Sequence, residues 1–211
     1  MVGPHYNWVS FDTQGGDVNE AIKIGRFLRE AVAQVSVMDN CFSSCFLAIV
    51  GSVGVGPFPS DKIGIHRPFT AAEELKRVNS SDYERYYNQL KGGIWQYLLD
   101  MDVPVTLIEK MFSVPSTEVY FLTQNDIALL SHHPAYEEWL AAQCPKTLSS
   151  AEEQDHVNDV DAFMTGRKSP ISKGYSRYLS DQSLKHDNCT YDVRWQQLTR
   201  AVDTHLNRTS P

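Results

Sequence analysis

The stretch CFSSCFLAIV, residues 41–50, decides the fold class of this chain. It follows a β-rich run at residues 35–38, and its apolar part at 46–50 has helical character. The sequence therefore predicts a strand that turns directly into a helix, with Ser43 in the turn. A serine at the first turn of a helix lies near the positive end of the helix dipole, which favours negative charge on its oxygen. Ser43 is thus a candidate nucleophile.

A nucleophilic serine needs a proton acceptor and donors for the oxyanion that forms on its substrate. His66 follows 23 positions after Ser43 (66 − 43), at the end of a short apolar strand in IGIHRP, residues 63–68. A neighbouring parallel strand would bring its ring beside the hydroxyl. Upstream, a strand at residues 8–11 runs into Gly15–Gly16, where the backbone is free to turn and expose N–H groups. The spacing predicts nucleophile, base and oxyanion donors.

A glycine pair, a serine opening a helix and a histidine in a His-x-Pro segment, in this order, resemble the Clp protease proteolytic subunit, whose fold is shared with the crotonases. The chain is most similar to a periplasmic Clp-like branch, in which cysteines bracket the serine as Cys41 and Cys45 bracket Ser43 here. The likeness covers about residues 7–130. It implies a crotonase-like spiral of strands and helices, a periplasmic location and assembly into a homo-oligomer.

The resemblance also implies an activity, that of a serine peptidase acting on peptides or proteins through an acyl-enzyme, without a cofactor. Nothing in the chain resembles a P-loop, so the peptidase would be independent of ATP. Carried over position by position, the roles are nucleophile for Ser43, general base for His66 and oxyanion hole for the backbone N–H groups of Gly15, Gly16 and Ser44.

The third member of the site falls in VPSTEVYFLT, residues 114–123, where the family places an acid before a similar strand. Glu118 is nearest to that place, with glutamate in the position of the usual aspartate. A register one residue later would put Val119 there and leave Ser43 and His66 as a dyad.

Two other function classes stay open. A crotonase-like enzyme would use the same oxyanion hole on an acyl thioester, with a carboxylate as the catalytic group. A catalytically silent binding or scaffold protein would keep the fold without the chemistry. Serines also cap helices, so Ser43 or Ser44 would be explained without a reaction. Taken alone, a glutamate such as Glu118 is more often a surface carboxylate than a catalytic one.

Composition and charge argue against some classes of binding partner. The 211 residues carry a formal net charge of −7 and no basic cluster, which argues against binding to nucleic acid or an anionic membrane. No apolar run approaches the roughly 20 residues needed to span a bilayer, so membrane insertion is not expected. The amino terminus lacks signal-peptide features, which predicts a cytoplasmic protein if it is the true start. Only 14 residues precede Gly15, where the family has a strand-helix-strand unit, so we expect a truncated chain.

The four cysteines form an even set, which is compatible with two disulfides outside the cytosol. Cys41 and Cys45 either bridge across the serine turn or are two small buried side chains. Cys144 and Cys189 would staple the later part of the chain. No metal site is expected, because the cysteines lack paired spacing with adjacent histidines. The acidic cluster at residues 152–159 indicates a helix amino terminus instead.

The strand-helix alternation predicts an α/β domain over residues 1–130, followed by a helical extension packed on it over 131–211. A helix is expected over 17–32 and a long helical stretch over 71–101, kinked or split at Gly92–Gly93. The other expected elements are a strand at 62–65, helices at 104–112 and 126–130, and an amphipathic helix at 191–206.

Overall fold

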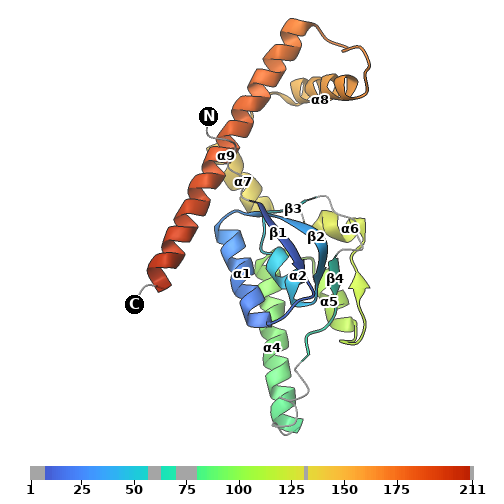
Figure 1. Cartoon of the computed structure of the whole chain (residues 1–211), viewed down its shortest axis with the longest axis vertical. Coiled ribbons are helices and arrows are strands. Elements are labelled where there is room, and N and C mark those ends of the chain that lie inside the picture. Colours follow the sequence, from blue (N-terminus) through green and yellow to red (C-terminus); the bar gives the residue numbers. More distant parts are fainter. Residues whose placement is uncertain (1–7, 57–62, 70–79, 131–132, 210–211) are drawn as a thin grey trace. The chain divides into compact units, whose positions relative to one another are not determined.

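The computed structural model describes residues 8–56, 63–69, 80–130 and 133–209. The chain divides into two compact units, shown with the colours of the sequence in Figure 1. The sheet unit is Asn7–His133 together with Gln197–Pro211, and the helical unit is Met1–Tyr6 together with Pro134–Gln196. This division lies near the predicted boundary at 130/131, but it assigns the last residues of the chain to the sheet unit.

In the part of the chain that the structure describes, a mixed sheet of five strands forms the centre of the sheet unit. Its order is β1-β2-β4-β5, and β3 also pairs with β2. The first four strands pair in parallel, whereas β5 is antiparallel to β4. The unit is therefore mixed α/β. The strands are β1 (Trp8–Thr13), β2 (Gln34–Phe42), β3 (Gly54–Val55), β4 (Ile63–Ile65) and β5 (Tyr120–Phe121).

The helices of the sheet unit begin at identifiable caps and bury apolar faces. The Asp17 side chain accepts a hydrogen bond from the N–H of Glu20 and starts α1, and Thr123 with Asp126 forms a capping box at α6. Every residue of α2 is buried. The helices are α1 (Val18–Glu30), α2 (Ser44–Ile49), α4 (Ser80–Asp100), α5 (Val105–Ser113) and α6 (Gln124–Leu129).

Two glycines let α1 and α2 approach each other and α4. A Cβ at Gly25 would lie 1.8 Å from the hydroxyl of Tyr97, and one at Gly51 would lie 2.0 Å from the carbonyl oxygen of Gly25. The Tyr97 hydroxyl donates a 2.7 Å hydrogen bond to the carbonyl of Leu47. Burial raises the pKa of this phenol. The core is thus closed by backbone contacts that larger residues would prevent.

Arg29 ties the ends of the helices together. Its guanidinium donates to the carbonyls of Val50 and Met101 at 3.2 and 3.1 Å and contacts Asp102 at 2.9 Å. Nδ1 of the buried His133 lies 3.5 Å from the same carboxylate. Desolvation, and secondly the Arg29 charge, lower the pKa of His133. These contacts of Arg29 fix the backbone at the C-terminal ends of α2 and α4.

Helix α4 continues through Gly92–Gly93, so of the two predicted effects the split is wrong and the kink stays a prediction. A Cβ at either glycine meets open space. The earlier part of the predicted helical stretch, residues 71–79, lies outside the described residues.

The glycine pair gives a stability prediction. Alanine is favoured over glycine in a helix by about 0.5–1 kcal/mol, and no neighbour opposes the added methyl groups here. The double substitution Gly92→Ala and Gly93→Ala should raise the free energy of unfolding by about 1–2 kcal/mol. Urea denaturation with an unchanged m-value checks this. A lower midpoint would mean that α4 needs flexibility at this point.

The helical unit consists of α7 (Pro134–Gln143), α8 (Ser150–Met164) and the first part of α9 (Lys173–Thr209). Ser149 and Glu152 form a capping box, which confirms that the acidic cluster opens a helix. A disulfide joins Cys144 to Cys189. Several apolar side chains of α8 stay exposed, with Phe163 at 83% the most open.

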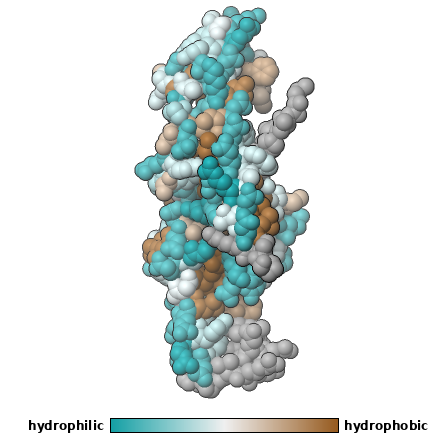
Figure 2. Space-filling model, turned by 90° about the vertical axis from the view of Figure 1, so that its left-hand side faces the viewer, coloured by the Kyte–Doolittle hydropathy of each residue, from teal (hydrophilic) through white to brown (hydrophobic). Residues whose placement is uncertain are grey.

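The surface combines apolar and polar side chains. Figure 2 shows brown hydrophobic side chains interspersed with teal hydrophilic ones on the face it presents. No helix within the described ranges is both long and apolar enough to cross a membrane.

Candidate functional site

Ser43 occupies a tight strand-to-helix turn. Strand β2 ends at Phe42, α2 begins at Ser44, and the backbone of Ser43 has φ 58° and ψ −126°. A positive φ is costly for a residue with a Cβ, and a nucleophilic serine on a sharp strand-to-helix turn is a known use of such strain. The Ser43 N–H donates to the carbonyl of Gly64 at 2.9 Å. Its side chain makes no capping hydrogen bond, so helix capping does not explain this serine.

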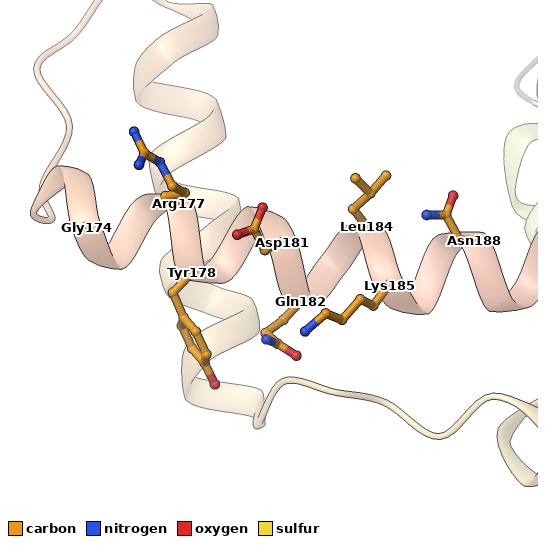
Figure 3. Close-up of a pocket in the computed structure, with 8 residues that line it drawn as sticks. All are labelled: Gly174, Arg177, Tyr178, Asp181, Gln182, Leu184, Lys185 and Asn188. Atoms are coloured by element: carbon orange, nitrogen blue, oxygen red, sulfur yellow. The ribbon is translucent and has the colours of Figure 1, made fainter. Parts of the chain in front are cut away.

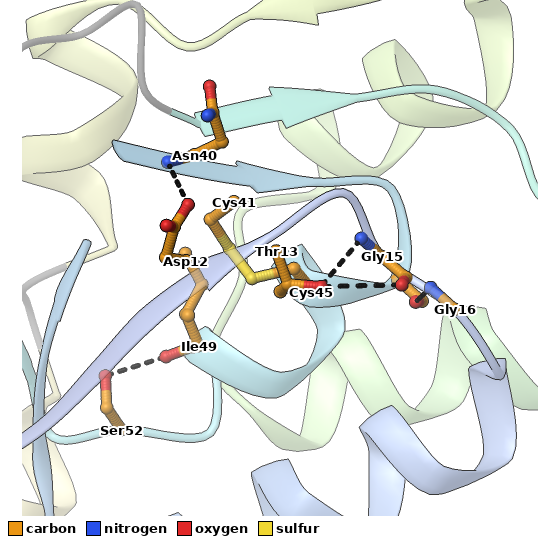
Figure 4. The surroundings of a disulfide bond; sticks show 10 residues. Asp12, Thr13, Gly15, Gly16, Asn40, Cys41, Cys45, Ile49 and Ser52 are labelled. Carbon is orange, nitrogen blue, oxygen red and sulfur yellow. Dashed lines mark hydrogen bonds between the residues drawn. A yellow bond between two sulfur atoms is a disulfide. The ribbon is translucent and has the colours of Figure 1, made fainter. Parts of the chain in front are cut away.

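A disulfide links the two cysteines that flank the serine turn. Cys41 and Cys45 are bridged with a Cα–Cα distance of 5.2 Å, so the first of the two alternatives for this pair holds (Figure 4). Both residues are buried, and Cys41 lies in register with Thr13 of β1 and Ile63 of β4. The bridge therefore fixes the serine turn to the centre of the sheet.

The two disulfides also bear on location. Both cysteine pairs are bridged, and no described cysteine is free. Disulfides of this kind form and persist in oxidising compartments. The chain thus belongs in an oxidising compartment.

The predicted glycine turn lies directly against Ser43. Gly15 has φ +101°, and a Cβ there would come within 2.7 Å of the Phe42 carbonyl oxygen and 2.8 Å of the Ser43 Cβ. Only glycine fits such a position. The turn at the end of β1 and the turn at the end of β2 are consequently in contact, as the sequence predicts.

Both glycine N–H groups are engaged by hydroxyl oxygens. The Gly16 N–H donates to Ser44 Oγ at 2.6 Å. The Gly15 N–H donates to Thr13 Oγ1 at 3.2 Å, as Figure 4 shows. Sequence reasoning anticipated the N–H groups but missed these hydroxyls, because nothing in the pattern indicates the direction of a serine or threonine side chain. A substrate oxygen would have to replace Ser44 Oγ at Gly16.

His66 follows β4 directly and is half-buried. Its Nδ1 lies 2.8 Å from the carbonyl oxygen of Arg67. A carbonyl can only accept, so Nδ1 carries a proton in this contact, and in the neutral ring Nε2 is the acceptor. The ring centroid of Phe69 lies 6.0 Å from that of His66. Within the described residues no hydrogen bond joins His66 to Ser43.

His66 is nevertheless held near the serine turn through its strand. Phe42 pairs with Gly64 in the parallel ladder of β2 and β4, and the Ser43 N–H continues that ladder. His66 comes two residues after Gly64. In enzymes, hydrogen bonds between catalytic groups are often long or poorly aligned before a substrate binds. The register places His66, the predicted base, at the end of the strand next to the one that leads into Ser43. The contact with the Arg67 carbonyl determines which ring nitrogen of His66 carries the proton.

Glu118 is exposed, and no hydrogen bond or ion pair of its side chain occurs in the described part of the chain. Its N–H donates to the Pro115 carbonyl within its own turn. Ile65 pairs with Tyr120, so one further step of the same antiparallel register would pair His66 with Val119. The assignment of Glu118 as the third member of the site stays a prediction. The Arg67 carbonyl already orients the His66 ring.

The described residues hold two further features of interest. A pocket of about 180 Å³ lies beside the glycine turn, and Ser44 and Cys45 contribute to its lining. A second pocket lies along α9 and is lined by that helix alone (Figure 3). In Figure 3 Arg177 and Asp181 point to one side of the helix and Tyr178 and Gln182 to the other, so the lining side chains do not converge.

No cluster of three or more metal-ligating side chains occurs in the described ranges. No family model, curated protein or solved structure matches the chain.

Proposed function

We propose that this chain is a serine peptidase, independent of ATP, that resembles the Clp proteolytic subunit and acts in the periplasm. One observation carries the proposal: the strained turn at Ser43 is bridged by Cys41–Cys45 and packed against Gly15. Strain in a non-glycine residue persists only where the surroundings over-determine it, and such residues cluster at active sites. A crotonase-like fold and self-assembly are parts of the same proposal.

In the proposed reaction, Ser43 Oγ attacks the carbonyl carbon of the substrate, and Nε2 of His66 takes the hydroxyl proton. The Nδ1–H bond to the Arg67 carbonyl holds the ring in the required tautomer. The oxyanion accepts hydrogen bonds from the N–H groups of Gly16 and Ser44, after the Ser44 hydroxyl turns away from Gly16.

Breakdown of the tetrahedral intermediate and hydrolysis of the acyl-enzyme complete the reaction. The imidazolium of His66 donates its Nε2 proton to the leaving amine as the C–N bond breaks, which leaves an ester between Ser43 and the acyl part. His66 then takes a proton from water, and the hydroxide attacks this ester. The bond between the acyl carbon and Ser43 Oγ then breaks, the His66 imidazolium gives its proton to Ser43 Oγ, and the carboxylic acid is released.

A silent scaffold of the same architecture is the second candidate. The observation that favours it is that Thr13 and Ser44 already occupy the glycine N–H groups. The two candidates differ in one measurable property, the nucleophilicity of Ser43.

We expect a fluorophosphonate to form a single adduct on Ser43, detected by intact mass and peptide mapping. Ser43→Ala should abolish the adduct, and His66→Gln should slow its formation by about 10²–10⁴-fold because the general base is lost. Ser113→Ala, an exposed serine at the end of α5, is the matched control and should label like the parent.

The outcome is decisive if a reference serine hydrolase labels fully in the same mixture. An unlabelled Ser43 would then favour the silent scaffold. Labelling that is insensitive to His66→Gln would keep the nucleophile but remove His66 from its role.

A further inference from the structure

Helix α8 of the helical unit carries an exposed apolar stripe. Phe163 and Met164 are 83% and 76% exposed, and Val157 and Val160 are exposed as well. Residues three and four positions apart lie on one face of a helix, so these side chains follow one another along α8. Large apolar side chains gathered in contact with water are unfavourable, and such patches mark interaction sites.

The opposite side of α8 contacts α9. Asp155 accepts a hydrogen bond from the Tyr175 hydroxyl at 3.2 Å, and Asp159 accepts one from the Ser176 hydroxyl at 2.5 Å. Ala162 lies on the same side of the helix, three positions after Asp159, and is buried. These contacts with the start of α9 fix the rotation of α8, and they direct the apolar stripe away from α9.

The two ends of the stripe carry opposite charges. Glu153 lies in the first turn of α8, four positions before Val157, and Arg167 follows four positions after Phe163. The Arg167 N–H donates to the carbonyl of Ala162 at 2.7 Å, which holds this arginine at the end of the helix. Arg167 is exposed and Glu153 is half-buried. The stripe thus runs from an acidic end to a basic end.

A cavity of about 400 Å³ lies beside the stripe. Val160, Phe163 and Arg167 all contribute to its lining, so these three side chains lie on one side of the molecule. When two helices pack, a side chain of one inserts into a hole formed by residues of the other. The cavity beside α8 has room for such a side chain from a second helix.

We infer that α8 pairs with α8 of a second copy of this chain, with the two helices antiparallel across a two-fold axis at Val160. Positions equally far from Val160 in opposite directions then face each other. Val157 of one copy faces Phe163 of the other and enters the cavity, and Glu153 faces Arg167. A two-fold interface has to be self-complementary, and the stripe meets this requirement in both shape and charge.

Other occupants fit the stripe less well. A parallel second copy would bring Glu153 beside Glu153 and Arg167 beside Arg167, so like charges would meet at both ends. An anionic lipid surface would meet a helix that holds acidic residues and no lysine or arginine. The stripe also lies outside residues 7–130, on which the resemblance to the Clp subunit rests. Pairing through α8 is therefore separate from the peptidase proposal.

Sedimentation velocity of the full chain over a concentration series tests the pairing. The stripe of one 15-residue helix makes a small interface, so we expect a reversible dimer with a dissociation constant of about 10–100 µM. Phe163→Glu should weaken the dimer by about 30-fold or more, because it places a carboxylate in the apolar contact of both copies. Val105→Glu, at an exposed position of α5, is the matched control and should leave the dissociation constant unchanged.

Charge reversal tests the antiparallel register. Glu153→Lys alone, or Arg167→Glu alone, should weaken the dimer by about 3–10-fold, because like charges then face each other at both ends. An equimolar mixture of the two variants should regain the dimer, since a pair with one copy of each has opposite charges at both ends. Circular dichroism of each variant checks that the helices are retained.

Cysteine cross-linking tests the position of the two-fold axis. All four native cysteines are bridged, so an added thiol is the only free one. Val160→Cys should give a disulfide-linked dimer on a non-reducing gel after mild oxidation, because the two copies of this position face each other. Val157→Cys, on the same stripe, is the matched control and should stay monomeric on the gel because it faces Phe163.

The outcomes decide each part of the proposal. A monomer throughout the concentration series overturns the pairing, and so does a dimer that Phe163→Glu leaves intact. Cross-linking of Val157→Cys as readily as Val160→Cys overturns the antiparallel arrangement. A mixture of the two charge variants that associates no better than either alone overturns the proposed register. Fluorophosphonate labelling of Ser43 is independent of all these results.

Discussion

Gly51→Ala should destabilise the sheet unit by about 3 kcal/mol or more, which is a large part of the stability of a typical domain. A Cβ at this position would lie 2.0, 2.4 and 2.5 Å from the oxygen, carbonyl carbon and Cα of Gly25. All three are backbone atoms, so no side chain can rotate away. Helix α1 would have to separate from the end of α2, opening a core that includes Tyr97.

Urea denaturation followed by circular dichroism measures this effect. Gly25→Ala should also destabilise, because its Cβ would lie 1.8 Å from the Tyr97 hydroxyl and 2.7 Å from the Leu47 carbonyl oxygen. Gly92→Ala makes the same chemical change where the space is open and serves as the matched control. A midpoint for Gly51→Ala close to the parent's would show that α1 and α2 are not in backbone contact.

These two glycines illustrate what the sequence does not reveal. Periodicity predicts the helix at residues 17–32 and places Gly25 on its apolar stripe, and α1 (Val18–Glu30) confirms the helix. The stripe does not say which residue meets a backbone, because that depends on how two helices cross. Strand β2 extends to Phe42, beyond the predicted residues 35–38. Its register with β1 shifts between Val37 and Cys41, so Asp39 and Asn40 lie in an irregularity of the ladder, and pairing resumes at Cys41 with both β1 and β4.

The candidate site also combines features that the sequence predicts with features that it does not reveal. Order and spacing place Gly15, Ser43 and His66 at neighbouring strand ends, because parallel strands that end together bring their following residues together. The engagement of the Gly16 N–H by Ser44, and of the His66 Nδ1 by its own neighbour, depends on side-chain rotamers. Glu118 rests on likeness to a family pattern, and the antiparallel ladder pairs residues only as far as Ile65 with Tyr120, so Glu118 and the alternative at Val119 both stay predictions.

The helical unit should depend on its disulfide much more than the sheet unit depends on Cys41–Cys45. Cross-linking restricts the unfolded chain more when the loop is longer. The separation of 45 residues between Cys144 and Cys189 corresponds to about 4 kcal/mol in the chain-entropy account, against about 2 kcal/mol for the separation of four in Cys41–Cys45.

The composition of the helical unit increases that dependence. Its buried apolar residues are few, and the apolar side chains of Phe163 and Met164 remain largely exposed. A unit of this size with a thin core usually needs a staple.

Replacing Cys144 and Cys189 by alanine should therefore remove protection from hydrogen exchange over α7 and α8, with the sheet unit still protected. The matched variant, with Cys41 and Cys45 replaced by alanine, should leave α7 and α8 protected. Equal losses in the two variants would mean that the two units unfold together, and that the stability of the helical unit comes from its contacts rather than from the staple.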